Sequence, residues 1–208
     1  TGNTAASSFL RATTRNSSRC PTGDGAAALV LTTPERARAL GRPEGRVRAS
    51  ALHSGVPIEG FRDMLRPRIT EASAADAYEE AGIGSDDLDV VELHDAFTIA
   101  ELVYYEALGL CEEGSSLQFS RRGAATYGGD VVVNPSGGLL AKGHPVGASG
   151  VAQMVELYWQ LTDVAGERQV ESAHWGLAHV TGGGIAQLAQ SWLGNGGNLS
   201  ISREQIEA

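Results

Sequence analysis

One glycine-rich stretch, Asn134 to Met154, constrains the fold of this chain more than any other part of the sequence. The apolar run Val131 to Val133 leads into it and predicts a strand. An apolar helix face follows, with the i, i+3, i+4, i+7 spacing of core residues, at Val151, Met154, Val155 and Tyr158. In between, glycines permit a close approach of backbone to a ligand and prolines fix the turn. On this turn His144 is either a solvent-facing side chain or a group that changes protonation near neutral pH.

Strand and helix patterns alternate along the chain, which predicts an α/β fold. Strands are expected at 26–31, 46–52, 88–93, 175–180 and 185–193, and helices at 33–41, 70–81 and 98–109, with a polar connection at 111–129. Thr98 and Glu101 have the spacing of a capping box, and that helix should bury Ile99, Leu102 and Val103. Such alternation is typical of a mainly parallel sheet with helices on both faces.

Composition excludes several classes of function. A net charge of −9 argues against a nucleic-acid partner, which would require a basic face. No apolar run reaches the roughly 18 residues that span a membrane. No signal peptide opens the chain, so a cytoplasmic location is expected. Cys20 and Cys111 indicate neither a disulfide framework nor a metal site. Because the chain begins at Thr1 without methionine, it reads as part of something longer or as a chain whose start was lost.

Three histidines, His94, His144 and His179, lie at or just past the ends of predicted strands, where α/β sheets bind ligands. His94 either donates a hydrogen bond to an oxyanion, directly or through water, or fills a polar pocket while Asp95 caps the next helix. His144 has the setting of a general base toward a nucleophile. The sequence shows no convincing nucleophile for His144, because both cysteines lie in settings typical of structural residues.

The triglycine Gly182-Gly183-Gly184 also has two readings. Its backbone N–H groups are suited to hold a carbonyl oxygen, and the same residues are equally suited to connect two antiparallel strands. Because no helix follows, it is not a dinucleotide-binding fingerprint.

Taken together, these residues resemble the thiolase family. Cys20 to Ala28 is similar to the segment that ends the amino-terminal half of a thiolase, and Asn134 to Gly150, with Gly143-His144-Pro145, resembles the carboxy-terminal signature. His94-Asp95-Ala96-Phe97 resembles the His-Asp-Cys-Phe block of the sterol-carrier-protein and archaeal branch, where other thiolases carry Asn-Glu-Ala-Phe. His179 to Gly184 resembles the last glycine loop.

The resemblance implies a thiolase-like half with a five-stranded mixed sheet between helices. Residues 1–45 would be the end of the amino-terminal half and residues 46–208 the carboxy-terminal domain. The strand at 26–31 would pair outside that sheet, or be poorly ordered without the first half. The exposed surfaces of such a half imply a companion: the missing amino-terminal half or a separate subunit, in a homodimer of such pairs.

The resemblance also implies Claisen condensation, or its reverse, on acyl-CoA thioesters. Coenzyme A would be substrate or product, with no permanently bound cofactor and no metal. A cysteine in the first half takes the acyl group, and His144 matches the histidine that activates it. His94 matches the position that helps to bind the thioester oxygen. The N–H of Gly182 matches part of a second oxyanion hole.

Two departures from the family pattern affect the expected reaction. Thiolases use a second cysteine to move the proton on the α-carbon, and the two positions that supply it hold Ala96 and Val180 here. Thiolase-type acyl transfer remains the main expectation. One alternative is a thiolase-like aldolase that cleaves a β-hydroxyacyl-CoA, for example a sterol side chain, with an OB-fold acyl-CoA-binding partner. Tyr104, Tyr105 and Tyr127 are then candidate acids or bases. The other alternative is a catalytically silent scaffold subunit.

Overall fold

The computed structural model describes residues 19–41, 43–54 and 65–181, and the backbone of 190–194. Its strands are β1 (Arg46–Ala51), β2 (Val90–Glu92), β3 (Val132–Val133), β4 (Trp175–Ala178) and β5 (Gln190–Gly194). They form one sheet in the order β1-β5-β4-β2-β3. Strand β2 is parallel to β3 and to β4, whereas β5 is antiparallel to β4 and to β1. This mixed sheet with its flanking helices confirms the predicted α/β fold.

The helices are α2 (Pro34–Leu40), α3 (Arg68–Ala81), α4 (Thr98–Ala107), α5 (Ser116–Arg121), α6 (Gly138–Lys142) and α7 (Val146–Leu161), with 3-10 turns η1 (Ser85–Asp87) and η2 (Gly166–Arg168). Local capping signals mark the start of α2 and the ends of α2 and α3. At the start of α2, the Thr33 hydroxyl accepts a hydrogen bond from Arg36 N. Gly41 and Gly82 end α2 and α3 in the left-handed conformation, which glycine adopts without strain.

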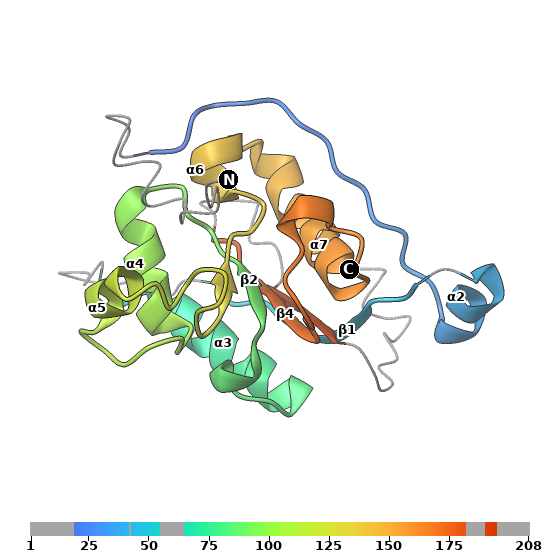
Figure 1. Ribbon diagram of the computed structural model, residues 1–208, viewed down its shortest axis with the longest axis horizontal. Coiled ribbons are helices and arrows are strands. Elements are labelled where there is room, and N and C mark those ends of the chain that lie inside the picture. The colour runs from blue at the N-terminus through green and yellow to red at the C-terminus, as the bar shows by residue number, and fades with distance from the viewer. Residues whose placement is uncertain (1–18, 42, 55–64, 182–189, 195–208) are drawn as a thin grey trace.

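The sheet lies between two helical layers (Figure 1). Alternate side chains of a strand point to opposite faces. Val91 and Leu177 pack in the core formed with α3, α4 and α5, and their neighbours Val90 and Ala178 pack in a second core with α7. Both faces of the central strands are therefore buried, which fixes the positions of the loops that follow their carboxyl ends.

Helix α7 buries a different face from the predicted one. Val151, Met154, Val155 and Tyr158 are only half-buried, although Met154 and Tyr158 pack against the second core. The buried face consists largely of polar side chains and the leucines between them, namely Ser149, Gln153, Glu156, Leu157, Gln160 and Leu161. The polar groups are stable there because they are bonded: Gln153 Nε2 donates to His179 O at 3.3 Å, and Gln160 Nε2 donates to Glu156 Oε1 at 2.9 Å.

The capping box predicted for α4 is wrong. Phe97 is the N-cap residue and makes no side-chain cap. Glu101 is instead fully buried and accepts a hydrogen bond from the Tyr105 hydroxyl at 2.5 Å. Ile99, expected in the core, is 58% exposed. The connection at 111–129 contains α5, whose Phe119 packs in the core.

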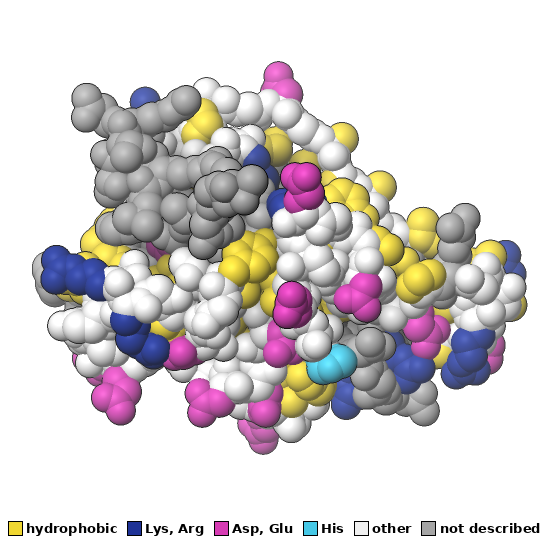
Figure 2. Space-filling model, viewed as in Figure 1, with side chains coloured by type: hydrophobic (Ala, Val, Ile, Leu, Met, Phe, Trp, Pro, Cys, Tyr) yellow, Lys and Arg dark blue, Asp and Glu magenta, His cyan; other side chains and the backbone are white. Residues whose placement is uncertain are grey.

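The apolar run at 26–31 forms no strand, contrary to prediction. It is extended, lies outside the sheet, and passes over α6 and α7 on its way to α2 (Figure 1). Val30 is 88% exposed and Leu31 is 68% exposed. Hydrophobic side chains accordingly appear along the upper right of the molecule in Figure 2. A strand needs a neighbouring backbone for its hydrogen bonds, and the described residues offer none here.

Candidate active site

Two loops at the carboxyl ends of β2 and β3 build the candidate site. Asn134 connects them, because its N–H donates to Val91 O at 2.7 Å and its side-chain oxygen accepts from Leu93 N at 2.9 Å. The residue adopts a φ of 50°, a conformation that asparagine tolerates better than most residues. The loop at 134–145 is thereby held against the turn that carries His94.

Two buried carboxylates hold the same loop by accepting hydrogen bonds from it. Asp95 accepts from Leu139 N at 2.6 Å at the start of α6, and burial raises its pKa to about 6. Glu92 accepts from the N–H and the hydroxyl of Ser136, at 3.0 and 2.7 Å, and burial raises its pKa as well. Asp95 therefore positions a loop, which favours the structural reading of that residue.

Gly138 is where this loop is least tolerant of change. Its φ is 62°, and a Cβ there would lie 2.1 Å from Asp95 Oδ2. We expect Gly138→Ala to lower the free energy of unfolding by more than about 1 kcal/mol, measured by urea denaturation. Gly147→Ala is the control, because a Cβ at Gly147 meets nothing within 4 Å and its φ is not positive. Equal midpoints for the two variants would contradict the tight packing at Gly138.

His144 is placed beside the Ser149 hydroxyl. Its Nδ1 lies 2.8 Å from Ser149 Oγ, and that oxygen lies 3.0 Å from Pro145 O. When the hydroxyl donates to Pro145 O, Nδ1 carries a proton and donates to Ser149, which leaves the lone pair of a base on Nε2. Burial lowers the pKa of His144, so the neutral form predominates at pH 7.

His94 meets His144 edge to face. The ring centroids lie 4.8 Å apart with an interplanar angle of 89°. His94 is only 8% exposed, and its Nδ1 is buried without a hydrogen-bond partner among the described residues. Burial, and then the neighbouring His144, lower the pKa of His94 to about 4. The rings of His94 and His144 are thus both neutral and pack against each other.

His179 is placed differently from the other two histidines. It is 1% exposed, its Nε2 lies 3.2 Å from the Thr70 hydroxyl, and its ring packs against Tyr104 at a centroid distance of 4.5 Å. Burial, and then the neighbouring His94, lower its pKa to about 3. Strand alternation directs it toward α3 and α4, so it supports the site from inside the fold.

Ala96 follows His94 by two residues, and Val180 follows β4, the strand that pairs with β2 up to Glu92 and Ala178. Ala96 and Val180 are each 8% exposed. The two positions where the resemblance places a proton-transferring cysteine are therefore both buried and apolar.

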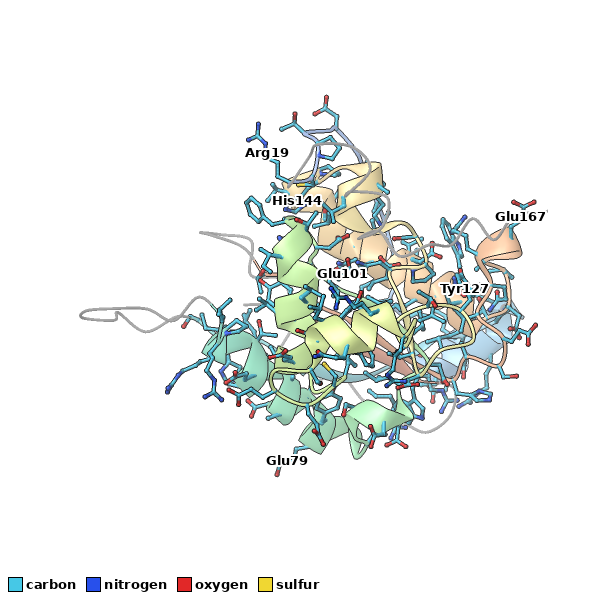
Figure 3. The ribbon with its side chains drawn as sticks, turned by 60° about the vertical axis from the view of Figure 1, so that its left-hand side comes forward. Arg19, Glu79, Glu101, Tyr127, His144 and Glu167 are labelled. Carbon is cyan, nitrogen blue, oxygen red and sulfur yellow. The ribbon has the colours of Figure 1, made fainter. Side chains whose placement is uncertain are left out.

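Cys20 is the site residue that sequence reasoning missed. Its N–H donates to Ala96 O at 2.8 Å, and the next carbonyl, Pro21 O, accepts from His144 N at 3.3 Å. The segment thus contacts the turns of both histidines, and Figure 3 shows Arg19 and His144 at the same end of the molecule. Burial, and then Asp95, raise the pKa of the Cys20 thiol. No local spacing signals this contact, because it depends on a segment far away in sequence.

An open cavity of about 570 Å³ adjoins His144. It is lined by the start of α7 and the extended segment, at Gly23 to Ala27 and His144 to Ala148.

Gly182, predicted to supply an oxyanion N–H, lies outside the described residues. Within the described part of the chain, no group of three His, Cys, Asp or Glu side chains is arranged to hold a metal ion. None of the helices described is long and apolar enough to cross a membrane.

The candidate tyrosines are engaged in structural bonds. Tyr105 donates to Glu101, and Tyr127 donates to Arg168 O at 2.6 Å, on a side of the molecule away from His144 (Figure 3). The Tyr104 hydroxyl bonds the Thr181 hydroxyl at 2.9 Å. Among the described residues, none of the three hydroxyls bonds His94 or His144, which argues against a tyrosine base.

Residues 50–195 match the family model described as "Thiolase C-terminal domain-like". The benzoylsuccinyl-CoA thiolase subunit BbsB of Thauera aromatica is 48% identical over 79% of this chain and 43% of its own length. Sterol carrier protein 2 of Rattus norvegicus is 44% identical over 80% of the chain and 32% of its own length. The acetyl-CoA acetyltransferase of Methanothermobacter thermautotrophicus is 42% identical, with 78% and 43% covered.

A solved structure titled "Ltp2-ChsH2(DUF35) aldolase" has the same fold, with a TM-score of 0.68 at 23% identity, over 77% of this chain and 42% of that one. The chain therefore spans less than half the length of the relatives it matches.

Proposed function

The chain belongs to the thiolase family, and from that premise we propose that it is the carboxy-terminal half of an enzyme that makes or breaks carbon–carbon bonds in acyl-CoA thioesters. The observation that carries the proposal is the His94–His144 pair, two neutral imidazoles whose rings lie 4.8 Å apart, with His144 lining an open cavity. Relatives named as thiolases and as an acetyltransferase support acyl transfer as the first reading.

In this reading His144 Nε2 takes the proton of a nucleophile supplied by the rest of the protein. His94 donates a hydrogen bond to the thioester oxygen, which carries negative charge when the adjacent α-carbon becomes an enolate. Because His94 is largely buried, its hydrogen bond to that charge is stronger than it would be in water. Neither step requires a metal or a resident cofactor from this chain.

The second candidate is an aldolase that cleaves a β-hydroxyacyl-CoA with an OB-fold partner. One observation favours it: the buried residues Ala96 and Val180 occupy the two positions where the resemblance places a proton-transferring cysteine, and neither side chain can transfer a proton. A base such as His144 would remove the β-hydroxyl proton while the Cα–Cβ bond breaks, and His94 would hold the resulting enolate. The third reading, a silent scaffold, predicts neither reaction.

The two reactions are separated by their need for free coenzyme A. The assembly of this chain with its companion is offered a β-ketoacyl-CoA plus free CoA, and separately a β-hydroxyacyl-CoA. Thiolytic release of a shortened acyl-CoA supports the thiolase reading. Release of an aldehyde or ketone without free CoA supports the aldolase, and failure of both reactions, with acyl-CoA binding or without it, supports the scaffold.

The companion is expected to cover the extended segment at 26–31, as an amino-terminal half or a separate subunit in a homodimer of pairs. Val30→Asp should weaken association with that companion at least about tenfold, because a buried unpaired carboxylate is costly. Val164→Asp, on an exposed residue outside the segment, is the control. Titration of one polypeptide with the other measures both. Equal dissociation constants would place the interface elsewhere.

A further inference from the structure

The proposed reaction lacks a group that moves the proton on the α-carbon. Both thiolysis and aldol cleavage leave an electron pair on that carbon, and both need an acid to protonate it. Ala96 and Val180 cannot serve. Of the candidate tyrosines, Tyr105 and Tyr127 donate their protons to a carboxylate and a carbonyl.

Cys20 is the acidic side chain that the fold brings to this place. Its backbone is bonded to Ala96 at 2.8 Å, so its segment lies directly against the turn where the resemblance puts the missing cysteine. The bond between Pro21 O and His144 N, at 3.3 Å, places the same segment against the other histidine. Arg19 and Phe97 extend the contact by pairing as an antiparallel bridge.

A second observation marks the same spot as a ligand site. His94, two residues before Ala96, is more than nine-tenths buried, and its ring packs at right angles to the ring of His144. Its Nδ1 has no hydrogen-bond partner among the described residues. A buried polar group without a partner is uncommon and requires an explanation, which a bound substrate or water would provide.

We propose that the Cys20 thiol is the acid that protonates the substrate α-carbon in this site, in place of the cysteine absent at Ala96 and Val180. The assignment rests on the proposed carbon–carbon chemistry. When the Cα–Cβ bond breaks, its electron pair remains on the α-carbon as an enolate held by His94. The S–H bond of Cys20 then breaks, its proton forms the new C–H bond, and the thiolate remains. In thiolysis the thiolate recovers a proton from free CoA, and in aldol cleavage from the imidazolium of His144.

The raised pKa of this thiol agrees with such a role, because the group keeps its proton at neutral pH until an enolate requires it. Cys111 is the natural comparison. It is also free and half-buried, but it packs beside the core of α4 and α5 rather than against the histidine turns.

The test uses the assembly of this chain with its companion, and compares Cys20→Ala, Cys20→Ser and Cys111→Ser with the parent. We expect Cys20→Ala to lower kcat by roughly 10²–10⁴ while KM changes by less than about threefold. It should also stop deuterium exchange from solvent into the α-carbon of a bound acyl-CoA, a readout that a structural role would not change selectively. Cys111→Ser should retain both activities. Cys20→Ser, which keeps the shape with a poorer acid, should fold and exchange slowly.

Alkylation followed by mass spectrometry adds a measurement without turnover. Acyl-CoA should protect Cys20 from iodoacetamide and leave Cys111 unprotected. If the parent assembly is active and Cys20→Ala turns over within threefold of the parent, the assignment of Cys20 is overturned and the proposed function still stands. A parent assembly that catalyses neither reaction would overturn both. If Cys20→Ala does not fold, loss of exchange in a folded Cys20→Ser supports the assignment, and unchanged exchange overturns it.

Discussion

His144→Gln in the complete assembly should lower kcat by roughly 10²–10⁴, because glutamine cannot accept and return a proton as the imidazole does. Acyl-CoA binding should persist, since glutamine occupies a similar volume and retains hydrogen-bonding groups. Steady-state kinetics with either candidate substrate, together with calorimetric titration of the acyl-CoA, separate the two effects. Turnover within threefold of the parent would make His144 a structural residue of the turn.

The same argument gives the pH dependence. The base must be neutral, and burial lowers the pKa of His144 below its usual value near 6.5. Activity should therefore fall as the pH drops through that lowered pKa, with the acid limb of kcat/KM below about 6.5. Ser149→Ala removes the hydroxyl that holds Nδ1 and should lower kcat far less than His144→Gln, because it changes only the population of the reactive tautomer.

Sequence patterns predicted the parts of the fold that depend on local conformation. Gly41 and Gly82 end helices because only glycine enters the left-handed region freely. The alternation of strands and helices gave the α/β class, and the strand ends brought His94 and His144 together. Those features are properties of a few consecutive residues, which a sequence displays directly.

Features that depend on a distant partner were not predictable in this way. Residues 26–31 have the composition of a strand, but the described residues contain no backbone for it to pair with. Gln153 and Gln160 are buried in α7 because their amides bond groups on other segments, whereas apolar periodicity selected the opposite face. Cys20 looked inert in sequence because its contact with Ala96 exists only in the folded chain.

The chemistry of the site depends on the role of His94, and removing its imidazole by substitution tests that role. Because burial keeps the His94 ring neutral, the ring is suited to donate a hydrogen bond to an oxygen whose negative charge grows during the reaction. Such a bond is stronger in the transition state than in the bound substrate, so its loss should appear in kcat and not in KM. We expect His94→Ala to lower kcat roughly 10²–10³-fold, the range found when one oxyanion donor is removed.

His94→Asn should retain more activity, because its amide N–H can donate directly or through a water. A thermal melt checks that the cavity left by alanine has not unfolded the protein. If His94→Asn and His94→Ala lose activity equally and both stay folded, hydrogen-bond donation is not what His94 contributes, and its role is to pack against the ring of His144 and hold that base in place.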